Sequence, residues 1–199
     1  MIIKKLDLQK YDRVKRLKLI NSICGIRGVH LIGSKSKNNN PNLAIFSSVT
    51  HLGSNPPLLS FISRPDNIVK RDTLSNIKKT KYYTINSVEK NHLKKAHQTS
   101  CKYPTEKSEF NECNFQEKYI NDFPAPFVEE SKVKIGMKLL DLIKIKQNNT
   151  ILIIGEIQMI QTTHKKINTN FKDSIGVIGL NSYYGINHIK DLDYCRFKK

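Results

Sequence analysis

The stretch NLAIFSSVTHLGSNPPLLSFISRPDNIVKRDTLSN, residues 42–76, carries the strongest structural signal in the chain. Its composition predicts a strand over residues 43–50, a turn over residues 51–57 and a second strand over residues 58–63. A polar loop follows, and the apolar spacing after it predicts a helix for which Asp72 is the expected N-cap. The order strand, strand, loop and helix start is the frame from which the rest of the chain is interpreted.

Small hydroxyl side chains interrupt both predicted strands, at Ser47, Ser48 and Ser63. On a strand they let the backbone of the protein approach a flat ligand and leave hydrogen-bond donors free. Arg64 and Arg71 lie beside the predicted helix start, where backbone N–H groups favour an anion. These features predict a ligand with a planar head and a phosphate tail, although the serines could instead fill a barrel interior and Arg71 could be a solvated surface cation.

The same stretch resembles the flavin reductase-like, FMN-binding split β-barrel proteins, through the successive motifs N-x-A-x-F-S-S, P-P, S-R-P and R-D-T-x-x-N-I. The likeness continues through six later segments, which together with the first extend it over most of the chain: residues 96–100, Tyr103-Pro104, Ser108-Glu109-Phe110, residues 125–129, residues 154–156 and residues 179–184. Each piece is short, and the signal lies in their order and spacing.

The resemblance implies a mainly β fold, an FMN-binding split β-barrel with a few short helical insertions, in a single domain over residues 1–199. It also implies a homodimer with each FMN near the subunit interface. The residue pattern agrees with many short strands separated by turns. It predicts hairpins between residues 28–33 and 43–50 and between 132–146 and 150–160, strands at 82–88 and 175–180, helical segments at 73–80, 89–101 and 108–115, and a charged strand or arm at 1–17.

The resemblance further implies where the cofactor lies. The flavin ring is expected against the segment Phe46-Ser47-Ser48-Val49, and the phosphate near Ser63, Arg64, Arg71, Asp72 and Thr73. His97, Thr99 and Ser100 are expected beside the ring, with His97 at the flavin edge or the nicotinamide site, although a lone histidine is also commonly structural. Where the broader family often has Pro-Arg-Pro, this chain has Gly25-Ile26-Arg27-Gly28, so we assign no ligand contact to that segment.

The implied activity is that of an oxidoreductase, a flavin reductase that transfers hydride from NADH or NADPH to FMN. In such an enzyme the cofactor carries the reaction, which agrees with the lack of a nucleophile elbow in the sequence. Neither G-x-G-x-x-G nor a P-loop is present, so a Rossmann dinucleotide site and a nucleoside triphosphatase are not indicated. The alternative is an FMN-holding electron carrier or flavin-binding protein without nicotinamide turnover.

The chain has 199 residues and a net charge of +17, from 34 Lys and Arg against 17 Asp and Glu. The lysines are spread along the chain without clustering, which argues against a nucleic-acid interface, although the charge suits anionic flavin and nicotinamide nucleotides. The four cysteines form no C-x-x-C pair, so no metal site is expected. No apolar run has the length of a membrane span and the N-terminal residues are charged, so a cytoplasmic location without membrane attachment is expected.

Overall fold

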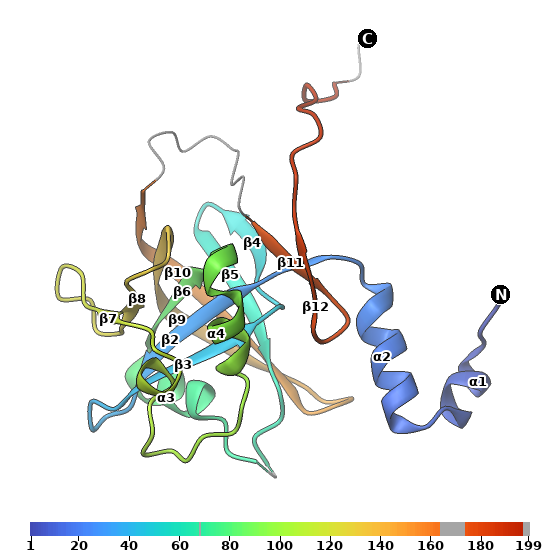
Figure 1. Ribbon diagram of the computed structural model, residues 1–199, viewed down its shortest axis with the longest axis horizontal. Coiled ribbons are helices and arrows are strands. Elements are labelled where there is room, and N and C mark those ends of the chain that lie inside the picture. The colour runs from blue at the N-terminus through green and yellow to red at the C-terminus, as the bar shows by residue number, and fades with distance from the viewer. Residues whose placement is uncertain (68, 164–173, 197–199) are drawn as a thin grey trace.

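The computed structural model describes residues 1–67, 69–163 and 174–196 of the chain. Seven strands within these residues form one antiparallel sheet in the order β3-β2-β6-β9-β10-β5-β4 (Figure 1). The end strands of this order, β3 and β4, are consecutive in the chain and only residues 47–49 join them, so the two ends of the sheet come together as in a barrel. The strands are β2 (His30–Lys35), β3 (Pro41–Phe46), β4 (Thr50–Ser54), β5 (Pro57–Ser63), β6 (Tyr82–Ser87), β9 (Val133–Ile145) and β10 (Thr150–Thr162).

Smaller elements surround this sheet, and the prediction of a mainly β fold with a few short helices is confirmed. Two further sheets are short: β1 (Arg27–Gly28), β11 (Ile175–Ile178) and β12 (Ser182–Gly185) form one, and β7 (Glu117–Lys118) pairs with β8 (Phe127–Val128). The helices are α1 (Lys5–Lys10), α2 (Arg13–Ile23), α3 (Asp72–Thr80), the 3-10 turn η1 (Lys90–His92), α4 (Leu93–Gln98) and α5 (Glu109–Glu112). The prediction of one domain over residues 1–199 stays a prediction.

The barrel interior is filled by apolar side chains from the sheet and from α3. Leu74 and Ile77 lie one turn apart on α3 and are both fully buried, which is the spacing by which a helix packs one face onto a sheet. The Phe61 ring packs edge-on against Tyr83, with 5.6 Å between ring centroids. A side chain at Gly155 would collide with the Tyr83 hydroxyl, so this glycine lets the phenol extend across the core. The beginning of α3 is thereby held at a fixed place beside the barrel.

Most predicted elements are found, with a correction in residues 42–76. The predicted strand over residues 43–50 divides into β3, which ends at Phe46, and β4, which begins at Thr50. The first part, β3, pairs with β2, while the residues from Thr50 onward pair as β4 with β5, which also pairs with β10. The predicted turn over residues 51–57 is correspondingly shorter, since β4 runs to Ser54.

Elsewhere the hairpins β2–β3 and β9–β10, the strand β6 and the helices α3, α4 and α5 agree with the predictions. The strand predicted over residues 175–180 is present as β11, but β12 was not predicted. The sequence also predicts a polar segment over residues 168–174 and a tail over residues 194–199, of which residues 168–173 and 197–199 lie outside the described residues.

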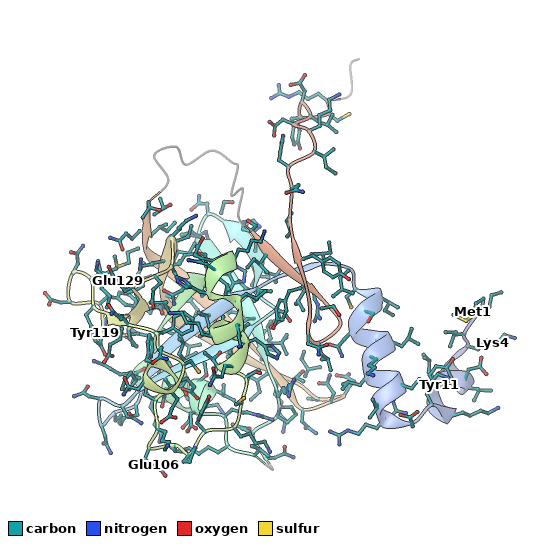
Figure 2. The ribbon with its side chains drawn as sticks, in the orientation of Figure 1. Met1, Lys4, Tyr11, Glu106, Tyr119 and Glu129 are labelled. Atoms are coloured by element: carbon teal, nitrogen blue, oxygen red, sulfur yellow. The ribbon has the colours of Figure 1, made fainter. Side chains whose placement is uncertain are left out.

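The N-terminal residues form two helices, so the predicted strand at 1–17 is wrong. Asp12 caps α2, because its carboxylate accepts hydrogen bonds from the backbone N–H groups of Val14 and Lys15 at 2.8 and 2.9 Å. Neither helix has a buried residue. Figure 2 shows the side chains of Met1, Lys4 and Tyr11 clear of the barrel, so the arm part of the prediction describes this region well.

Among the described residues, no helix is both long and apolar enough to cross a membrane.

Candidate functional site

A cavity of about 630 Å³ lies where several parts of the fold meet. Its walls come from β1, the end of β3 with residues 47–48, the end of β5, the beginning of α3, the end of α4 with residues 99–105, and the β11–β12 hairpin. This volume is in the range of sites that hold a small organic ligand. The cavity therefore brings together segments that are far apart in the sequence.

All but one of the predicted ligand contacts line this cavity. Val49 is the exception, because its side chain packs against the core cluster around Phe61 and Tyr83. The remaining predicted residues line the cavity together: Phe46, Ser47, Ser48, Ser63, Arg64, Arg71, Asp72, Thr73, His97, Thr99 and Ser100.

The serine hydroxyls are less available than predicted. The Ser48 hydroxyl accepts a hydrogen bond from the backbone N–H of Ile62 at 3.1 Å and faces its carbonyl oxygen at 3.4 Å. The pairing of β4 with β5 ends at Ser60, so no β4 residue lies opposite Ile62. The Ser48 hydroxyl takes the place of that missing backbone partner. The Ser63 hydroxyl donates to the Arg64 carbonyl at 3.1 Å. Within the described part of the chain, Ser47 is the one of these three serines whose hydroxyl has no hydrogen-bond partner.

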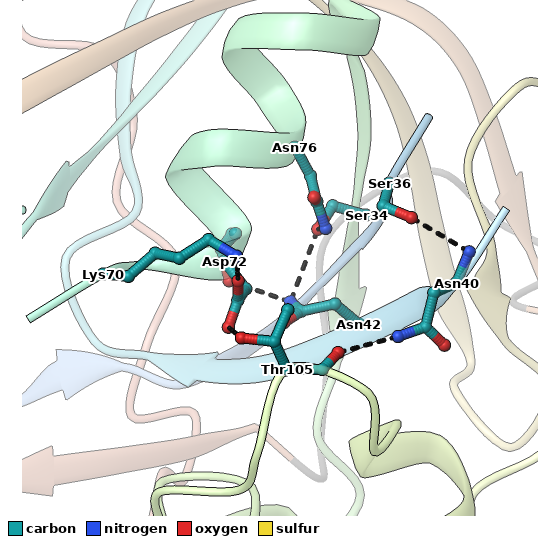
Figure 3. Close-up of polar contacts among 9 residues, drawn as sticks. Ser34, Ser36, Asn40, Asn42, Lys70, Asp72, Asn76 and Thr105 are labelled. Atoms are coloured by element: carbon teal, nitrogen blue, oxygen red, sulfur yellow. Dashed lines mark hydrogen bonds and ion pairs between the residues drawn. The ribbon is translucent and has the colours of Figure 1, made fainter. Parts of the chain in front are cut away.

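The beginning of α3 forms the polar end of the cavity. Arg71 stands at the N-cap and Asp72 is the first helical residue, so the predicted N-cap role of Asp72 is wrong by one position. The Asp72 carboxylate instead pairs with Lys70, at 2.9 Å, and accepts from the Thr105 hydroxyl, at 3.4 Å (Figure 3). The carboxylate is therefore neutralised locally, and the N–H groups at the start of α3 still favour an anion.

Four buried polar side chains stand behind this end of the cavity. The Asn42 amide donates to the Thr73 hydroxyl at 3.0 Å and to Ser34 at 3.4 Å, and the Asn76 amide donates to Ser34 at 3.3 Å (Figure 3). Each of the four is at most 9% exposed. Because the Thr73 oxygen accepts from Asn42, its own proton remains a donor for a ligand. The network fixes that hydroxyl before any ligand enters.

Two arginines carry buried nitrogen atoms that lack partners. Nε of Arg71 and Nε of Arg27 are each buried and have no hydrogen-bond partner among the described residues, and both side chains line the cavity. A buried donor without an acceptor is costly. A ligand with anionic or carbonyl oxygens would satisfy these atoms, which is an independent sign that the cavity is a binding site.

The opposite wall is formed by the end of α4 and by β12. Nδ1 of His97 lies 2.7 Å from the Tyr183 hydroxyl, and the two rings meet edge-on with 5.6 Å between centroids. The Thr99 hydroxyl donates to the Ala96 carbonyl at 2.8 Å, and the Ser100 hydroxyl donates to the His97 carbonyl at 2.7 Å. These two hydroxyl groups complete the helix end and can still accept from a ligand.

Lining residues that were not predicted from the sequence include Arg27, Asn42, Glu109 and Tyr183. Arg27 belongs to the segment to which no ligand contact was assigned, and its presence here corrects that inference. Glu109 was not predicted as a ligand contact, yet its Oε2 accepts from the Leu43 N–H at 3.0 Å, and burial raises the pKa of the carboxyl above its ordinary value. Tyr183 could have been found, because it stands in one of the segments that carry the resemblance.

Comparison with known proteins agrees with this geometry. Residues 25–175 match the family described as the flavin reductase like domain. The chain belongs to this family. This flavin reductase-like chain is similar to a Shewanella frigidimarina protein that is assigned as a flavin reductase with a split barrel domain, with 36% identity, a TM-score of 0.91 and coverage of 98% of this chain and 100% of the other. The predicted split barrel is therefore confirmed.

Two more distant relatives span nearly the whole chain. An uncharacterised protein of Aquifex aeolicus is 27% identical over 189 residues, which is 91% of this chain and 92% of the relative. Nitrilotriacetate monooxygenase component B from Bacillus cereus has the same fold, with a TM-score of 0.85, 17% identity and coverage of 96% of this chain and 98% of the other.

The residues of the cavity fit a flavin. A flavin mononucleotide has a flat, largely apolar ring and an anionic tail. Phe46, Ala44 and Ser47, whose hydroxyl has no partner among the described residues, line the cavity beside the strands. Arg71 and Thr73 line it at the start of α3, and Arg64 lines it after the end of β5. The cavity thus offers an apolar wall and a cationic end in the arrangement that such a molecule requires.

Proposed function

We propose that this flavin reductase-like protein binds FMN in the cavity and reduces it with NADH or NADPH. The observation that carries the proposal is the buried Nε of Arg71, which has no partner among the described residues, in a cavity that the fixed Thr73 hydroxyl also lines. These groups, with Arg64 and the first N–H groups of α3, are suited to a phosphate. FMN, with its single terminal phosphate, is the simplest flavin nucleotide that would use them.

The residues of this chain bind and orient the reactants. Arg71 and Thr73 hold the phosphate, and the buried network behind Thr73 keeps its hydroxyl in place. Phe46 would support the flavin ring. The Phe46 side chain is itself held by Phe61, with 4.9 Å between the centroids of the two phenyl rings. Bound flavin supplies the chemistry by accepting a hydride from reduced nicotinamide at its N5. His97, at the opposite wall, is placed to orient the flavin edge or the nicotinamide amide.

The anaerobic reduction of FMN-loaded protein tests this function. We expect the yellow flavin absorbance to bleach rapidly when NADH or NADPH is added, with one of the two preferred. Dithionite serves as the control that the bound flavin can be reduced. A protein that binds FMN and bleaches with dithionite but with neither nicotinamide would be an electron carrier or flavin-binding protein, and the reductase proposal would be rejected.

We further propose that the protein is a homodimer in the cytoplasm. The dimer is supported by large apolar side chains left exposed on the β9–β10 hairpin, where Leu140 is 51%, Ile143 45% and Ile160 59% exposed. Light scattering of the flavin-loaded protein at micromolar concentration should give the mass of two chains, and Ile143→Asp should lower it. A wild-type mass of one chain would count against the dimer, whereas the cytoplasmic location remains a prediction from the sequence.

A further inference from the structure

The contact between His97 and Tyr183 joins two elements that are anchored independently of each other. His97 is carried by α4, which is fixed to the core by the fully buried Ala96, and the Thr99 hydroxyl closes the end of this helix on the Ala96 carbonyl at 2.8 Å. His97 itself is exposed. The direction of its ring therefore depends on what it contacts beyond α4.

Tyr183 is carried by the β11–β12 hairpin, and several contacts hold this hairpin. In the strand register Tyr183 lies opposite Val177, which is buried, and Arg27 of β1 lies opposite Val177 on the other side. The Arg27 side chain also donates a hydrogen bond to the Gly179 carbonyl at the hairpin turn. Gly176 is approached so closely by Ile26 that a side chain there would collide. Tyr183 is thus presented from a fixed support.

We propose that Tyr183 is a positioning residue whose hydroxyl donates a hydrogen bond to Nδ1 of His97 and thereby leaves Nε2–H as the donor that the imidazole offers to a ligand in the cavity. The partner of one ring nitrogen determines where a neutral imidazole carries its proton. A proton donated to Nδ1 at 2.7 Å therefore requires that the ring's own proton be on Nε2. A donor at Nε2 suits the carbonyl oxygens of a flavin ring or of a nicotinamide amide.

The surroundings of Tyr183 agree with a donating phenol. Burial raises the pKa of the Tyr183 hydroxyl above its ordinary value, which favours the protonated phenol that the proposal requires. The ring of Tyr183 makes the edge-on contact with His97 independently of the hydroxyl. A phenylalanine at this position would therefore keep the packing and remove only the hydrogen bond.

Tyr183→Phe in the FMN-loaded full chain tests the proposal, with Tyr184→Phe as the matched control. Tyr184 is the next residue of β12, is 46% exposed and does not line the cavity. We expect Tyr183→Phe to slow anaerobic reduction by NADH or NADPH at saturation by about fivefold to tenfold, within the range of one positioned hydrogen bond. The FMN dissociation constant and melting temperature should stay close to those of the wild type, and Tyr184→Phe should change none of these quantities.

The double variant His97→Ala/Tyr183→Phe separates positioning from a general effect on structure. If Tyr183 acts through His97, adding Tyr183→Phe to His97→Ala should slow reduction no further. An equal slowing by Tyr183→Phe in both backgrounds would overturn the proposal, as would a single variant that reduces at the wild-type rate.

This inference rests on the proposed function for its kinetic effect, and a spectroscopic readout makes it testable without turnover. The ¹⁵N resonances of the His97 ring in FMN-loaded protein should show the proton on Nε2, and the Nδ1 resonance should move in Tyr183→Phe but not in Tyr184→Phe. A protonated Nδ1 in the wild type would overturn the proposal. Wild-type protein that is not reduced by either nicotinamide but has the expected resonances would reject the reductase function and retain the contact.

Discussion

The two walls of the cavity are held in different ways. At the start of α3, Asn42, Thr73, Asn76 and Ser34 are buried and interlinked, so the donors that face a ligand are fixed in advance. At the opposite wall, the ring of the exposed His97 has one hydrogen-bond partner among the described residues, the Tyr183 hydroxyl. Donors that are fixed in advance favour tight binding of a ligand. A single side chain at the cavity edge, by contrast, should affect mainly the reaction of the ligand atoms next to it. The comparison predicts that the α3 wall governs retention of the flavin and the His97 wall governs its reduction.

Arg71→Met should produce the largest effect, and this effect should be a loss of affinity for FMN. Loss of a charge-assisted hydrogen bond should weaken FMN binding by about 1.5–3 kcal/mol, or roughly 10- to 150-fold, while riboflavin binding changes little because riboflavin lacks the phosphate. Fluorescence titration measures both affinities. Lys79→Met is the control, because Lys79 is exposed on the same helix and does not line the cavity. Equal losses for FMN and riboflavin would show that the α3 wall does not hold the phosphate.

Ser48→Ala and Ser47→Ala form a matched pair that tests whether the strand side of the cavity belongs to the scaffold or to the ligand. Ser48→Ala leaves the backbone N–H and carbonyl of Ile62 without their partner, so the free energy of unfolding should fall by about 1–3 kcal/mol. Ser47→Ala should cost less, because its hydroxyl has no partner in the described part of the chain. Urea unfolding of the flavin-free protein measures both, and equal losses would contradict the assigned role of Ser48.

His97→Ala should act on the other wall. We expect the reduction of bound flavin to slow by about tenfold, equivalent to about 1.4 kcal/mol, with the FMN dissociation constant unchanged. Stopped-flow measurement per flavin-loaded molecule gives the rate, and a melting curve gives the stability. If only the melting temperature changes, His97 belongs to the scaffold and the proposed contrast between the walls is lost.

His30 on β2 should make the stability of the protein depend on pH. His30 lies opposite Phe46 in the β2–β3 register, and burial lowers the pKa of its imidazole from 6.5 to about 4. Because the unfolded chain takes up this proton before the folded chain does, stability should fall as the pH drops from 6.5 towards 4. Between pH 7 and 5.5 the loss should be about 1 kcal/mol, smaller than the preceding effects. Urea unfolding at both pH values should show this loss in the wild type but not in His30→Gln, and an equal loss in both proteins would contradict it.

The parts of the fold that could be predicted from the sequence have strong local signals. The β9–β10 hairpin has a long apolar pattern around an Asn-Asn turn, and α3 has buried Leu74 and Ile77 one turn apart. The division of the strand over residues 43–50 could not be predicted, because it accompanies a hydrogen-bond contact of the Ser48 hydroxyl with the backbone of Ile62 on the neighbouring strand β5. A side-chain hydrogen bond to a distant backbone group changes no hydrophobic pattern in the sequence, so the pattern could not reveal it.

The same reasoning explains the outcome at the site. Arg64, Arg71 and the serines could be predicted because they lie in the contiguous motifs of residues 42–76. Tyr183 stands in a segment that carries the resemblance, whereas Arg27 was missed because it reaches the cavity through the pairing of β1 with β11, short strands from opposite ends of the chain. Such pairing depends on tertiary packing rather than on local composition.

The structure of the protein crystallised with FMN tests the central claim most directly. The account predicts the phosphate within hydrogen-bond distance of Arg71 Nε and the Thr73 hydroxyl, with the ring beside Ser47 and one edge towards His97. A flavin bound in the reverse direction, with its phosphate beside His97 and Arg27, would contradict the division between the walls. FMN bound outside this cavity would contradict the assignment of the site itself.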